Sequence, residues 1–487
     1  MPVSKENSRS AFASRLDSNV GLYEFLNTGF HSVLRFLLLG AVGATMVLSC
    51  ATTPAPPAEA ALPPGGPAGA VLSQLTPRRA VDARAFTVNR MLERMTLEEQ
   101  IGQMIMPGLL YDRRGRTVQA MDEELRALIR EVKPGGFVLF GPNIATPEQV
   151  RALVVALQAE SRVPMIIATD QEGGVVRRIP SNAVMPATSI PAARTIGRTS
   201  DLDLAYQIAR VNARELRSLG ITLNFAPVAD VFTNPQNPIV GSRAFGTEAV
   251  AVAEMVEATV RGFQDEGVSA SLKHFPGHGD TLEDSHEEAT SVPHGIERLR
   301  AVELIPFERG IRAGADTVMI GHIGAPSVSG SSLPATLDRQ IVTTLLREQL
   351  GFEGVIVTDS LIMAGITRYY GERAIVVGAV RAGADILLRP ARPAAAVQYL
   401  LDAVERGELS RERIAESVRR ILLLKMERGL IAPPTVEAGT LGFRRVEQPG
   451  ALYSIPQYYV PPEHRLGLPE HRRLAEEVRR RAAQSGG

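Results

Sequence analysis

The chain of 487 residues has no excess of charge of either sign, since 53 basic residues balance 53 acidic ones. Nucleic-acid-binding proteins need a basic patch, so we expect no nucleic-acid partner here. A single cysteine, Cys50, excludes an intramolecular disulfide. No Gly-x-Gly-x-x-Gly follows a strand-like run, which argues against a dinucleotide-binding fold. The hydrophobic content of 45% and the charged content of 22% are ordinary for a globular protein.

An apolar, uncharged segment, residues 36–48, follows Arg35. Its length is typical of the hydrophobic part of a signal peptide and short for a membrane span. It runs into Ser49 and Cys50, and a small residue before a cysteine at this point resembles a bacterial lipobox. We therefore expect residues 1–49 to be a lipoprotein-type signal peptide. Cys50 would then carry a lipid that anchors the exported chain to a bacterial membrane, on its periplasmic or outer-surface side. An uncleaved anchor helix is the alternative.

Two segments flank the main body of the chain and differ from it in composition. Residues 50–84 are rich in proline, alanine and glycine, which is typical of a semi-extended tether. Residues 436–487 form a C-terminal extension that ends in a charged, helix-like stretch at 470–483. We expect this stretch to be a surface helix packed on the main domain; a contact with a partner or with lipid headgroups is the alternative.

Residues 85–435 alternate short apolar runs with amphipathic helical patterns, which indicates a parallel α/β fold. Eight repeats over this length favour a single (β/α)8 TIM-like barrel, and an open doubly wound sheet is the alternative. The expected strands are residues 101–106, 136–140, 165–170, 223–231, 270–274, 317–322, 355–359 and 386–388. The expected helices are residues 147–161, 201–219, 249–266, 296–313, 338–350, 372–382 and 394–405.

Titratable residues follow several of the apolar runs, namely Asp170, Lys273 with His274, His322 and Asp359. A single aspartate at such a place is often only the cap of the next helix. In a barrel, however, the carboxyl ends of all strands open on one face. We therefore expect these side chains to converge on one site.

The segment KHFPGHGDTLEDSH, residues 273–286, is a loop, because its proline and glycines argue against a helix. Asp284 lies two residues before His286, so its carboxylate can accept a hydrogen bond from the imidazole and raise its basicity. Such a histidine gives and takes a proton near neutral pH. Metal binding by His274, His278 and His286 is an alternative, but the spacing does not match a helical HExxH and no cysteine supports it. We expect no metal and no cofactor, and a structural role for His278.

The same segment resembles the signature of glycoside hydrolase family 3, in its β-N-acetylglucosaminidase (β-hexosaminidase) branch. Three further blocks resemble the family in the same order: ATDQEGGVVRR (168–178), FAPVADV (225–231) and IVTDSLIMAGI (356–366). The resemblance covers roughly residues 90 to 430, and four separate blocks are far more specific than one short motif.

The resemblance implies a retaining glycosidase on a (β/α)8-like barrel, which forms a covalent glycosyl-enzyme intermediate. Carried onto this chain, Asp359 is the nucleophile, and His286, oriented by Asp284, is the general acid/base in place of the usual second carboxylate. The substrate would be terminal β-linked N-acetylglucosamine on an oligosaccharide or muropeptide, from peptidoglycan or chitin-type fragments. The residues that would hold its hydroxyl groups are Asp170, Arg178, Arg243, Lys273 and His274. Because the chain has no tryptophan and only 5% aromatic residues, the sugar would be held mainly by hydrogen bonds. We expect a monomer.

The chain departs from the family pattern at Val175, where arginine is frequent, and at Ser360, where a second acidic residue or alanine is common; neither change removes a catalytic group. A phosphorylase of the same family is one alternative, because a histidine acid/base repels phosphate less than a glutamate would. A β-glucosidase is disfavoured by the Asp284-x-His286 pair. A non-catalytic, sugar-binding surface lipoprotein is an alternative of another class, and it would be expected to have lost the nucleophile or the pair.

Overall fold

The computed structural model describes residues 77–109, 115–431, 444–446, 455–457 and 466–485. They all belong to the second of two compact units, Val71–Gly487. The expected signal segment, Cys50 and most of the expected tether lie outside the described residues. Within the described ranges, we find no helix with both the length and the apolar character needed to cross a membrane.

Six strands form a parallel sheet in the order β2-β3-β4-β5-β7-β9, and β1 pairs with β10, also in parallel. Single parallel bridges from Gly108 to Val138 and from Val357 to Ile386 link this pair to the sheet. The arrangement is a TIM-barrel-like α/β fold. Its strands are β1 (Ile105–Met106), β2 (Gly136–Leu139), β3 (Ile166–Thr169), β4 (Leu223–Asn224), β5 (Ser269–Phe275), β7 (Thr317–Ile320), β9 (Val355–Thr358) and β10 (Leu387–Leu388).

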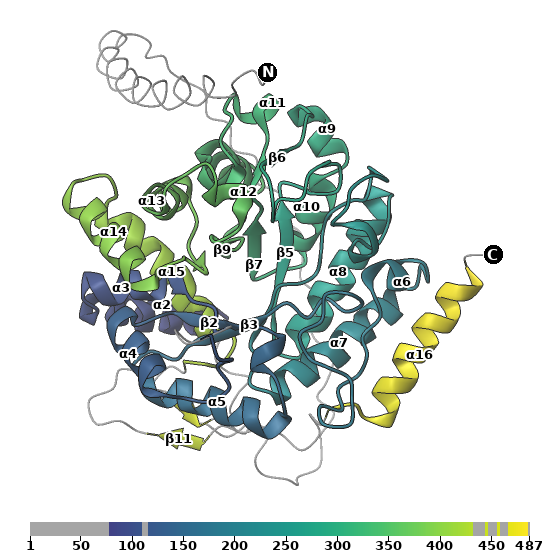
Figure 1. The fold of residues 1–487 in the computed structure, drawn as a ribbon, viewed down its shortest axis with the longest axis horizontal. Coiled ribbons are helices and arrows are strands. Elements are labelled where there is room, and N and C mark those ends of the chain that lie inside the picture. Colours follow the sequence, from purple (N-terminus) through teal and green to yellow (C-terminus); the bar gives the residue numbers. More distant parts are fainter. Residues whose placement is uncertain (1–76, 110–114, 432–443, 447–454, 458–465, 486–487) are drawn as a thin grey trace, which may run out of the picture. The chain divides into compact units, whose positions relative to one another are not determined.

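Helices lie around the outside of these strands (Figure 1). Every residue of strands β2, β3, β5, β7 and β9 is buried, as expected for parallel strands that are covered on both faces. The longer helices are α2 (Pro77–Arg94), α3 (Leu97–Gln103), α4 (Glu123–Val132), α5 (Pro147–Glu160), α7 (Leu202–Ser218), α8 (Ala249–Asp265), α9 (Ile296–Ala301), α10 (Leu304–Arg312), the π-helix Gln340–Gln349, α13 (Glu372–Ala382), α14 (Pro393–Glu405), α15 (Arg411–Glu427) and α16 (Pro469–Gln484).

Shorter elements decorate this frame. Strands β6 (Thr290–Ser291) and β8 (Ile323–Gly324) pair in parallel, and β11 (Arg444–Val446) pairs with β12 (Ile455–Gln457) in antiparallel orientation. The short helices are α6 (Ala193–Gly197), α11 (Pro326–Ser329), α12 (Ala364–Thr367) and the single 3-10 turns Gly141–Asn143, Gly241–Arg243 and Ala335–Leu337.

Three sequence-based expectations about these elements were wrong in part. The strand expected at 101–106 is mostly helix, because Thr96 caps α3 and its capping box with Glu99 starts the helix at Leu97. The strand expected at 223–231 is regular only over its first two residues, because Pro227 has no N–H to donate to a ladder; a single parallel bridge from Val228 to Lys273 follows it. The helix expected at 296–313 is interrupted at 302–303, just before the first turn of α10, where Pro306 is tolerated.

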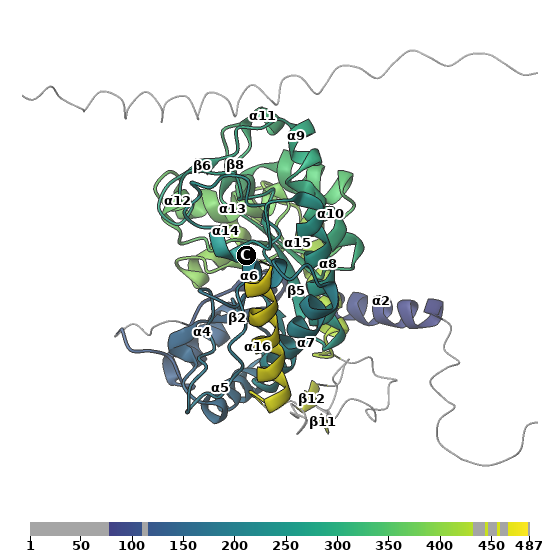
Figure 2. The ribbon, with the colours of Figure 1, turned by 90° about the vertical axis from the view of Figure 1, so that its right-hand side faces the viewer.

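The C-terminal helix α16 packs against α6 and α7, and Figures 1 and 2 both show it beside them. A buried carboxylate, Glu215 of α7, organises this contact. It accepts hydrogen bonds from the backbone N–H groups of Thr188 and Gly467, both at 2.8 Å. It also lies 3.2 Å from Nδ1 of His471. Residues 470–483 are therefore helical and packed on the main domain.

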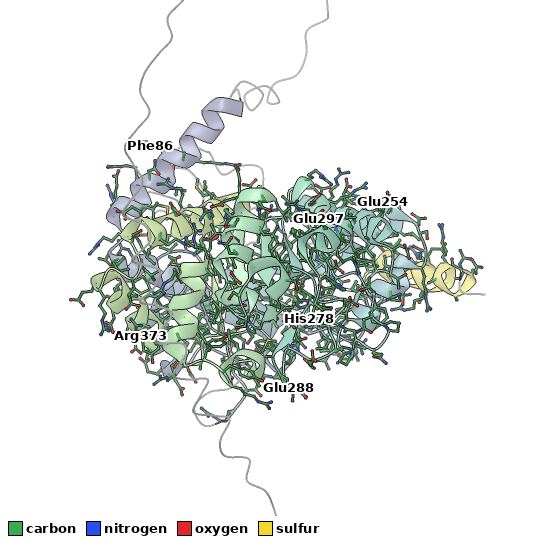
Figure 3. The ribbon with its side chains drawn as sticks, turned by 90° about the horizontal axis from the view of Figure 1, so that it is seen from above. Phe86, Glu254, His278, Glu288, Glu297 and Arg373 are labelled. Carbon is green, nitrogen blue, oxygen red and sulfur yellow. The ribbon has the colours of Figure 1, made fainter. Side chains whose placement is uncertain are left out.

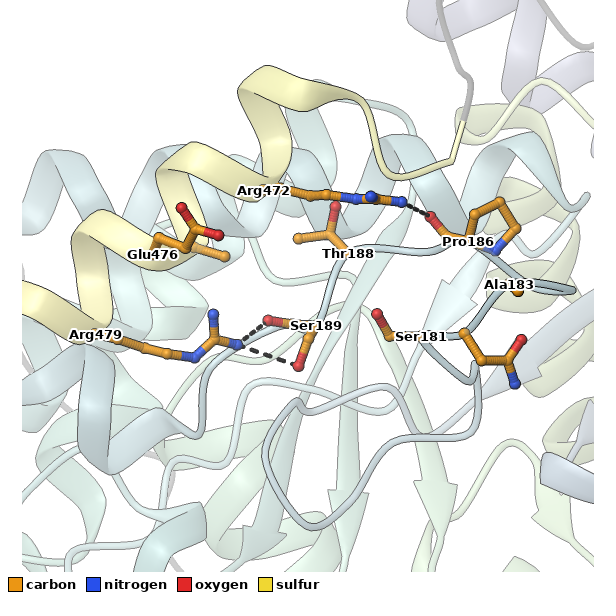
Figure 4. Close-up of a pocket in the computed structure, with 10 residues that line it drawn as sticks. Ser181, Ala183, Pro186, Thr188, Ser189, Arg472, Glu476 and Arg479 are labelled. Atoms are coloured by element: carbon orange, nitrogen blue, oxygen red, sulfur yellow. Dashed lines mark hydrogen bonds between the residues drawn. The ribbon is translucent and has the colours of Figure 1, made fainter.

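A pocket of about 390 Å³ opens between α16 and residues 181–189 (Figure 4). Arg472 donates to the carbonyl oxygen of Pro186 at 3.2 Å. Arg479 donates to the carbonyl oxygen of Ser189 and, at 3.2 Å, to its hydroxyl group. Both guanidinium groups are thus engaged in attaching the helix, and the pocket shares no lining residue with the site described next.

Candidate active site

A pocket of about 510 Å³ opens at the carboxyl ends of the parallel strands. Seven of the eight site residues expected within the described ranges line it. The eighth, Asp284, is not a lining residue, but its carboxylate contacts Nδ1 of His286. The lining residues named by the sequence are Asp170, Arg178, Arg243, Lys273, His274, His286 and Asp359. Of the strand-end residues expected to converge on one site, Asp170, Lys273, His274 and Asp359 line the pocket, whereas His322 is buried and does not.

Glu172, which follows β3, joins two of the basic side chains in this pocket. Its carboxylate accepts two hydrogen bonds from Arg243, both 2.8 Å long, and lies 2.7 Å from Nζ of Lys273. Lys273 also donates to Asp170 at 3.0 Å. Burial alone would raise the pKa of Glu172, but Lys273 and Arg243 hold it well below its usual range. Burial likewise opposes a charged Lys273, but Glu172 and Asp170 raise the pKa of that amine. The network therefore presents charged groups that form strong hydrogen bonds with hydroxyl groups.

The turn after β3 brings Arg178 back over the pocket. Its guanidinium group lies 3.6 Å from Asp170 and 5.7 Å from the ring centre of Phe140. The turn needs Gly173, whose φ is +98°, because a Cβ there would lie 2.4 Å from the carbonyl oxygen of Pro191. The glycine at 173 in the DQEGG block thus lets the backbone of this turn pass close to Pro191. The turn in this conformation sets the position of Arg178.

His274, at the end of β5, is fixed by a buried carboxylate. Its Nδ1 lies 2.8 Å from Asp230, which also accepts the backbone N–H of His278 at 2.7 Å. Burial would raise the pKa of Asp230, but His274 and His278 lower it below its ordinary value. An ionised Asp230 holds the proton of His274 on Nδ1, so Nε2, 3.4 Å from Arg243, is the nitrogen available in the pocket.

Asp359 follows β9 and is partly exposed in the pocket. Burial would raise the pKa of its carboxyl group, but His274, His322, His286 and the backbone N–H of Ser360 lower it to about 2. That N–H donates to Oδ1 at 2.7 Å. Asp359 is therefore a carboxylate at neutral pH.

His322, at the end of β7, supports this strand end from a buried position. Its Nε2 lies 3.0 Å from the carbonyl oxygen of Ser360, which can only accept, so Nε2 carries the proton. Its Nδ1 lies 2.7 Å from the hydroxyl group of Thr336. Burial lowers the pKa of His322, which favours the neutral ring.

The loop between β5 and β6 carries Asp284 and His286. The Nδ1 atom of His286 lies 2.8 Å from Asp284, which also accepts the backbone N–H of His286 at 2.7 Å. This pairing leaves Nε2 as the ring nitrogen that can serve a ligand in the pocket. The side chain of His286 is 54% exposed, so a ligand can reach it.

The rest of that loop is held from inside. His278 is buried, and its two ring nitrogens lie 2.6 Å from the hydroxyl group of Thr281 and 2.9 Å from that of Ser285. Burial lowers the pKa of His278 to about 4. His278 is 1% exposed, whereas Glu288, later in the loop, is exposed and lies at the lower edge of the view in Figure 3. These contacts agree with the structural role expected for His278.

Gly365 fixes the distance between the loop and α12. The backbone N–H of Ala364 donates to the carbonyl oxygen of His286 at 3.1 Å. A Cβ at Gly365 would lie 2.2 Å from the carbonyl oxygen of Ser285 and 2.8 Å from that of Glu288. Gly365 therefore allows the backbone of the loop that carries Asp284 and His286 to lie this close to α12.

The histidines of the loop do not gather around one point. His274, His278 and His286 each pair with a different oxygen, on Asp230, Thr281 and Asp284. Among the described residues, the metal-binding atoms of one group, Asp280, His294 and Glu303, lie within 4.8 Å of one another. None of these three lines the pocket.

Sequence reasoning missed four residues that shape the site: Glu172, Asp230, Phe140 and Arg389. Glu172 and Asp230 stand inside the quoted blocks ATDQEGGVVRR and FAPVADV. Their burial, which makes them partners of cations, is a tertiary property. Phe140 and Arg389 directly follow β2 and β10, and the rule that strand ends face the pocket could have found them.

Comparison with known proteins gives a family match and several relatives. Residues 96–424 match the family described as the glycosyl hydrolase family 3 N-terminal domain. The chain is 35% identical to β-hexosaminidase A of Pseudoalteromonas piscicida, over 74% of this chain and 67% of that protein. It is 39% identical to β-hexosaminidase of Stenotrophomonas maltophilia strain R551-3, over 52% of this chain and 75% of that protein.

A solved structure of a family 3 β-N-acetylglucosaminidase from Paenibacillus sp. FPU-7 superposes with a TM-score of 0.69. It is 40% identical in sequence, with 80% of this chain and 69% of that chain covered. The family match spans more than half of the chain and contains every residue that lines the pocket. The chain therefore belongs to glycosyl hydrolase family 3, and it is a glycoside hydrolase.

Proposed function

We propose that this protein is a retaining β-N-acetylglucosaminidase that removes terminal β-linked N-acetylglucosamine. The observation that carries the proposal is the placement of an ionised Asp359 and the Asp284–His286 pair around one pocket of about 510 Å³. Relatives named β-hexosaminidase and β-N-acetylglucosaminidase support the same assignment.

In the first step, the carboxylate of Asp359 attacks the anomeric carbon while His286 gives its proton to the leaving oxygen. The low pKa of Asp359 keeps the nucleophile ionised at any pH where the protein would work. The carboxylate of Asp284 holds the imidazole in place through Nδ1, which leaves Nε2 to give the proton. A covalent glycosyl-Asp359 intermediate results.

In the second step, His286, now neutral, takes a proton from a water molecule, which displaces Asp359 from the anomeric carbon. A second candidate reaction uses phosphate as the acceptor. Here the observation is the residue type itself, since a neutral imidazole repels an approaching phosphate less than a carboxylate would.

The sugar hydroxyl groups would be held by the charged network, namely Asp170, Arg178, Arg243, Lys273 and His274. Mutual pairing keeps these side chains in place before the sugar arrives, so little ordering is needed on binding. We also propose that the eight strands close into a complete (β/α)8 barrel. The parallel bridges at Gly108–Val138 and Val357–Ile386 support this closure.

The activity is tested by release of nitrophenol from the β-N-acetylglucosaminide and the β-glucoside, with and without phosphate. The hydrolase predicts rapid release from the first alone and no effect of phosphate. Phosphate stimulation with a sugar-1-phosphate product would instead support the phosphorylase. No release from either, and none from a cell-wall disaccharide, would contradict both and favour a sugar-binding protein.

The roles of the two groups are separated by variants. Asp359→Ala should remove turnover, while the matched control Asp203→Ala, on the exposed side of α7, should not. His286→Ala should slow natural disaccharides by about 10²–10⁴-fold and nitrophenyl glycosides much less, because nitrophenol leaves without protonation. Equal losses on both substrates would contradict the acid role.

For the whole chain, we propose a lipid anchor at Cys50 and peptidoglycan or chitin-type fragments as the source of the sugar. Cys50→Ala should move the protein from the membrane fraction to the soluble fraction of its natural host. Retention in the membrane would instead favour an uncleaved anchor helix.

A further inference from the structure

One basic side chain in the pocket, Arg389, has no task in the mechanism above. It directly follows β10, and its φ is +50°, in the left-handed region that few residues other than glycine adopt. Residues held in this conformation cluster at binding and catalytic sites, because the surrounding structure must enforce it. The backbone at this strand end therefore directs a long cationic side chain into the pocket.

Packing fixes the direction of that side chain. The guanidinium carbon of Arg389 lies 4.5 Å from the ring centre of Phe140, at the end of β2. The stem crosses Gly108, where a Cβ would lie 2.9 Å from Nε and 3.1 Å from both Cγ and Cδ of Arg389. The side chain is therefore preorganised by an aromatic face and by the absence of a side chain at residue 108.

The other cations of the pocket are paired with carboxylates, whereas Arg389 is not. Arg178 pairs with Asp170, and Arg243 and Lys273 share Glu172. Throughout the ranges that the structure describes, no carboxylate forms an ion pair or a hydrogen bond with the guanidinium group of Arg389. The pocket lining contains one lysine and three arginines, Lys273, Arg178, Arg243 and Arg389, and the guanidinium group of Arg389 is the one among these four that contacts no carboxylate within the described residues.

We propose that Arg389 binds an oxyanion, a carboxylate or a phosphate, that enters the pocket together with the sugar. A neutral N-acetylglucosaminide offers no acidic group to pair with this guanidinium group, whereas its planar fork of N–H donors matches both oxyanions. The proposal rests on the proposed function, because it concerns the occupant of the same pocket. It narrows the substrate class to glycosides with an acidic group near the scissile bond, or the acceptor to phosphate.

The phosphate case is chemically balanced. An oxygen of the phosphate dianion forms a bond to the anomeric carbon as the bond to Asp359 breaks, and the aspartate leaves with the bonding electron pair. The products are the free carboxylate and a sugar-1-phosphate monoanion. No oxidant, reductant or further proton is required.

The test measures kcat/KM of the wild-type protein, Arg389→Met and Arg389→Lys on two disaccharides that differ only in a carboxylate and its neutral amide. A charge-assisted contact predicts a preference for the carboxylate of about 10- to 100-fold in the wild type. This ratio should fall to near one in Arg389→Met and stay intermediate in Arg389→Lys. The matched control is Arg392→Met, on the same loop, because Arg392 is exposed and already paired with Glu372.

Phosphate is the second arm. If the anion is the acceptor, nitrophenyl N-acetylglucosaminide with phosphate should yield sugar-1-phosphate in the wild type and in Arg392→Met, and less in Arg389→Met. The proposal would be overturned if Arg389→Met had the same carboxylate-to-amide ratio and the same phosphate response as the wild type.

Calorimetry separates this failure from a failure of the proposed function. The ratio of the dissociation constants of the two disaccharides, measured on Asp359→Asn, reports the anion site without turnover. A wild-type protein that turns over neither sugar but binds the carboxylate form more tightly, in an Arg389-dependent way, would refute the hydrolase and support the anion site.

Discussion

Glu172→Gln would remove one negative charge from the centre of the pocket network with almost no change of shape. The two oxygens of Glu172 make three contacts of 2.8 Å or less with Arg243 and Lys273. The side chains of Glu172, Lys273 and Arg243 are 4%, 2% and 11% exposed. Water therefore cannot replace the lost charge, and the amide NH₂ group of glutamine would face a cation.

The expected loss of unfolding free energy is about 3–5 kcal/mol, the usual range when one partner of a buried ion pair is removed. Lys273 keeps Asp170 as a partner at 3.0 Å, which places the loss toward the lower end. Because the partners of Glu172 hold its folded pKa far below the unfolded value, its contribution is complete above about pH 4.5 and declines as the pH falls. The difference between wild type and variant should thus be constant from pH 6 to 9 and shrink below pH 4.5.

Urea unfolding of both proteins measures this difference, and KM measures its effect on the sugar site. The matched control is Glu257→Gln, which breaks a surface pair with Arg309 and should cost no more than about 1 kcal/mol. Equal losses in the two variants, together with an unchanged KM in Glu172→Gln, would refute the view that Glu172 organises the site.

Three further outcomes are expected. Burial lowers the pKa of Lys425 from 10.5 to about 7, so the folded state penalises its charged form fully below pH 7 and hardly at all above pH 10.5. The unfolding free energy of the wild type relative to Lys425→Met should therefore rise by a few kcal/mol between pH 6 and 10, and a flat difference in urea titrations would contradict the burial argument. Gly365→Ala should displace the loop with Asp284 and His286, lower the melting temperature and lower kcat/KM by about 100-fold; unchanged kinetics would show that the loop does not need this close approach. Prolonged treatment with a chelator should leave kcat/KM unchanged, since the candidate metal ligands Asp280, His294 and Glu303 lie outside the pocket lining, and a loss restored by a divalent cation would show a metal requirement.

Much of the fold followed from local patterns. The helices at 147–160, 202–218 and 372–382 begin and end within about one residue of the expected bounds, because their caps and amphipathic periods are written in the sequence. The β1 region was misjudged, since a short and largely apolar segment fits a buried helix end as well as a strand. The isolated bridge between Gly108 and Val138 could not be predicted, because its two residues are 30 positions apart and meet only when the chain folds.

For the site, the sequence by itself determined the residue types and their order, including Asp359, Asp284 and His286 in blocks typical of one family. It also determined that strand ends would bring Asp170, Lys273 and Asp359 to one face, because parallel strands share a direction. Only the tertiary structure decided which cation meets which carboxylate. It pairs Glu172 with Arg243 and Lys273 and leaves Arg389 without an acidic partner among the described residues. The physical reason is that the strength of an ion pair depends on distance and burial, and neither can be read from positions along the chain.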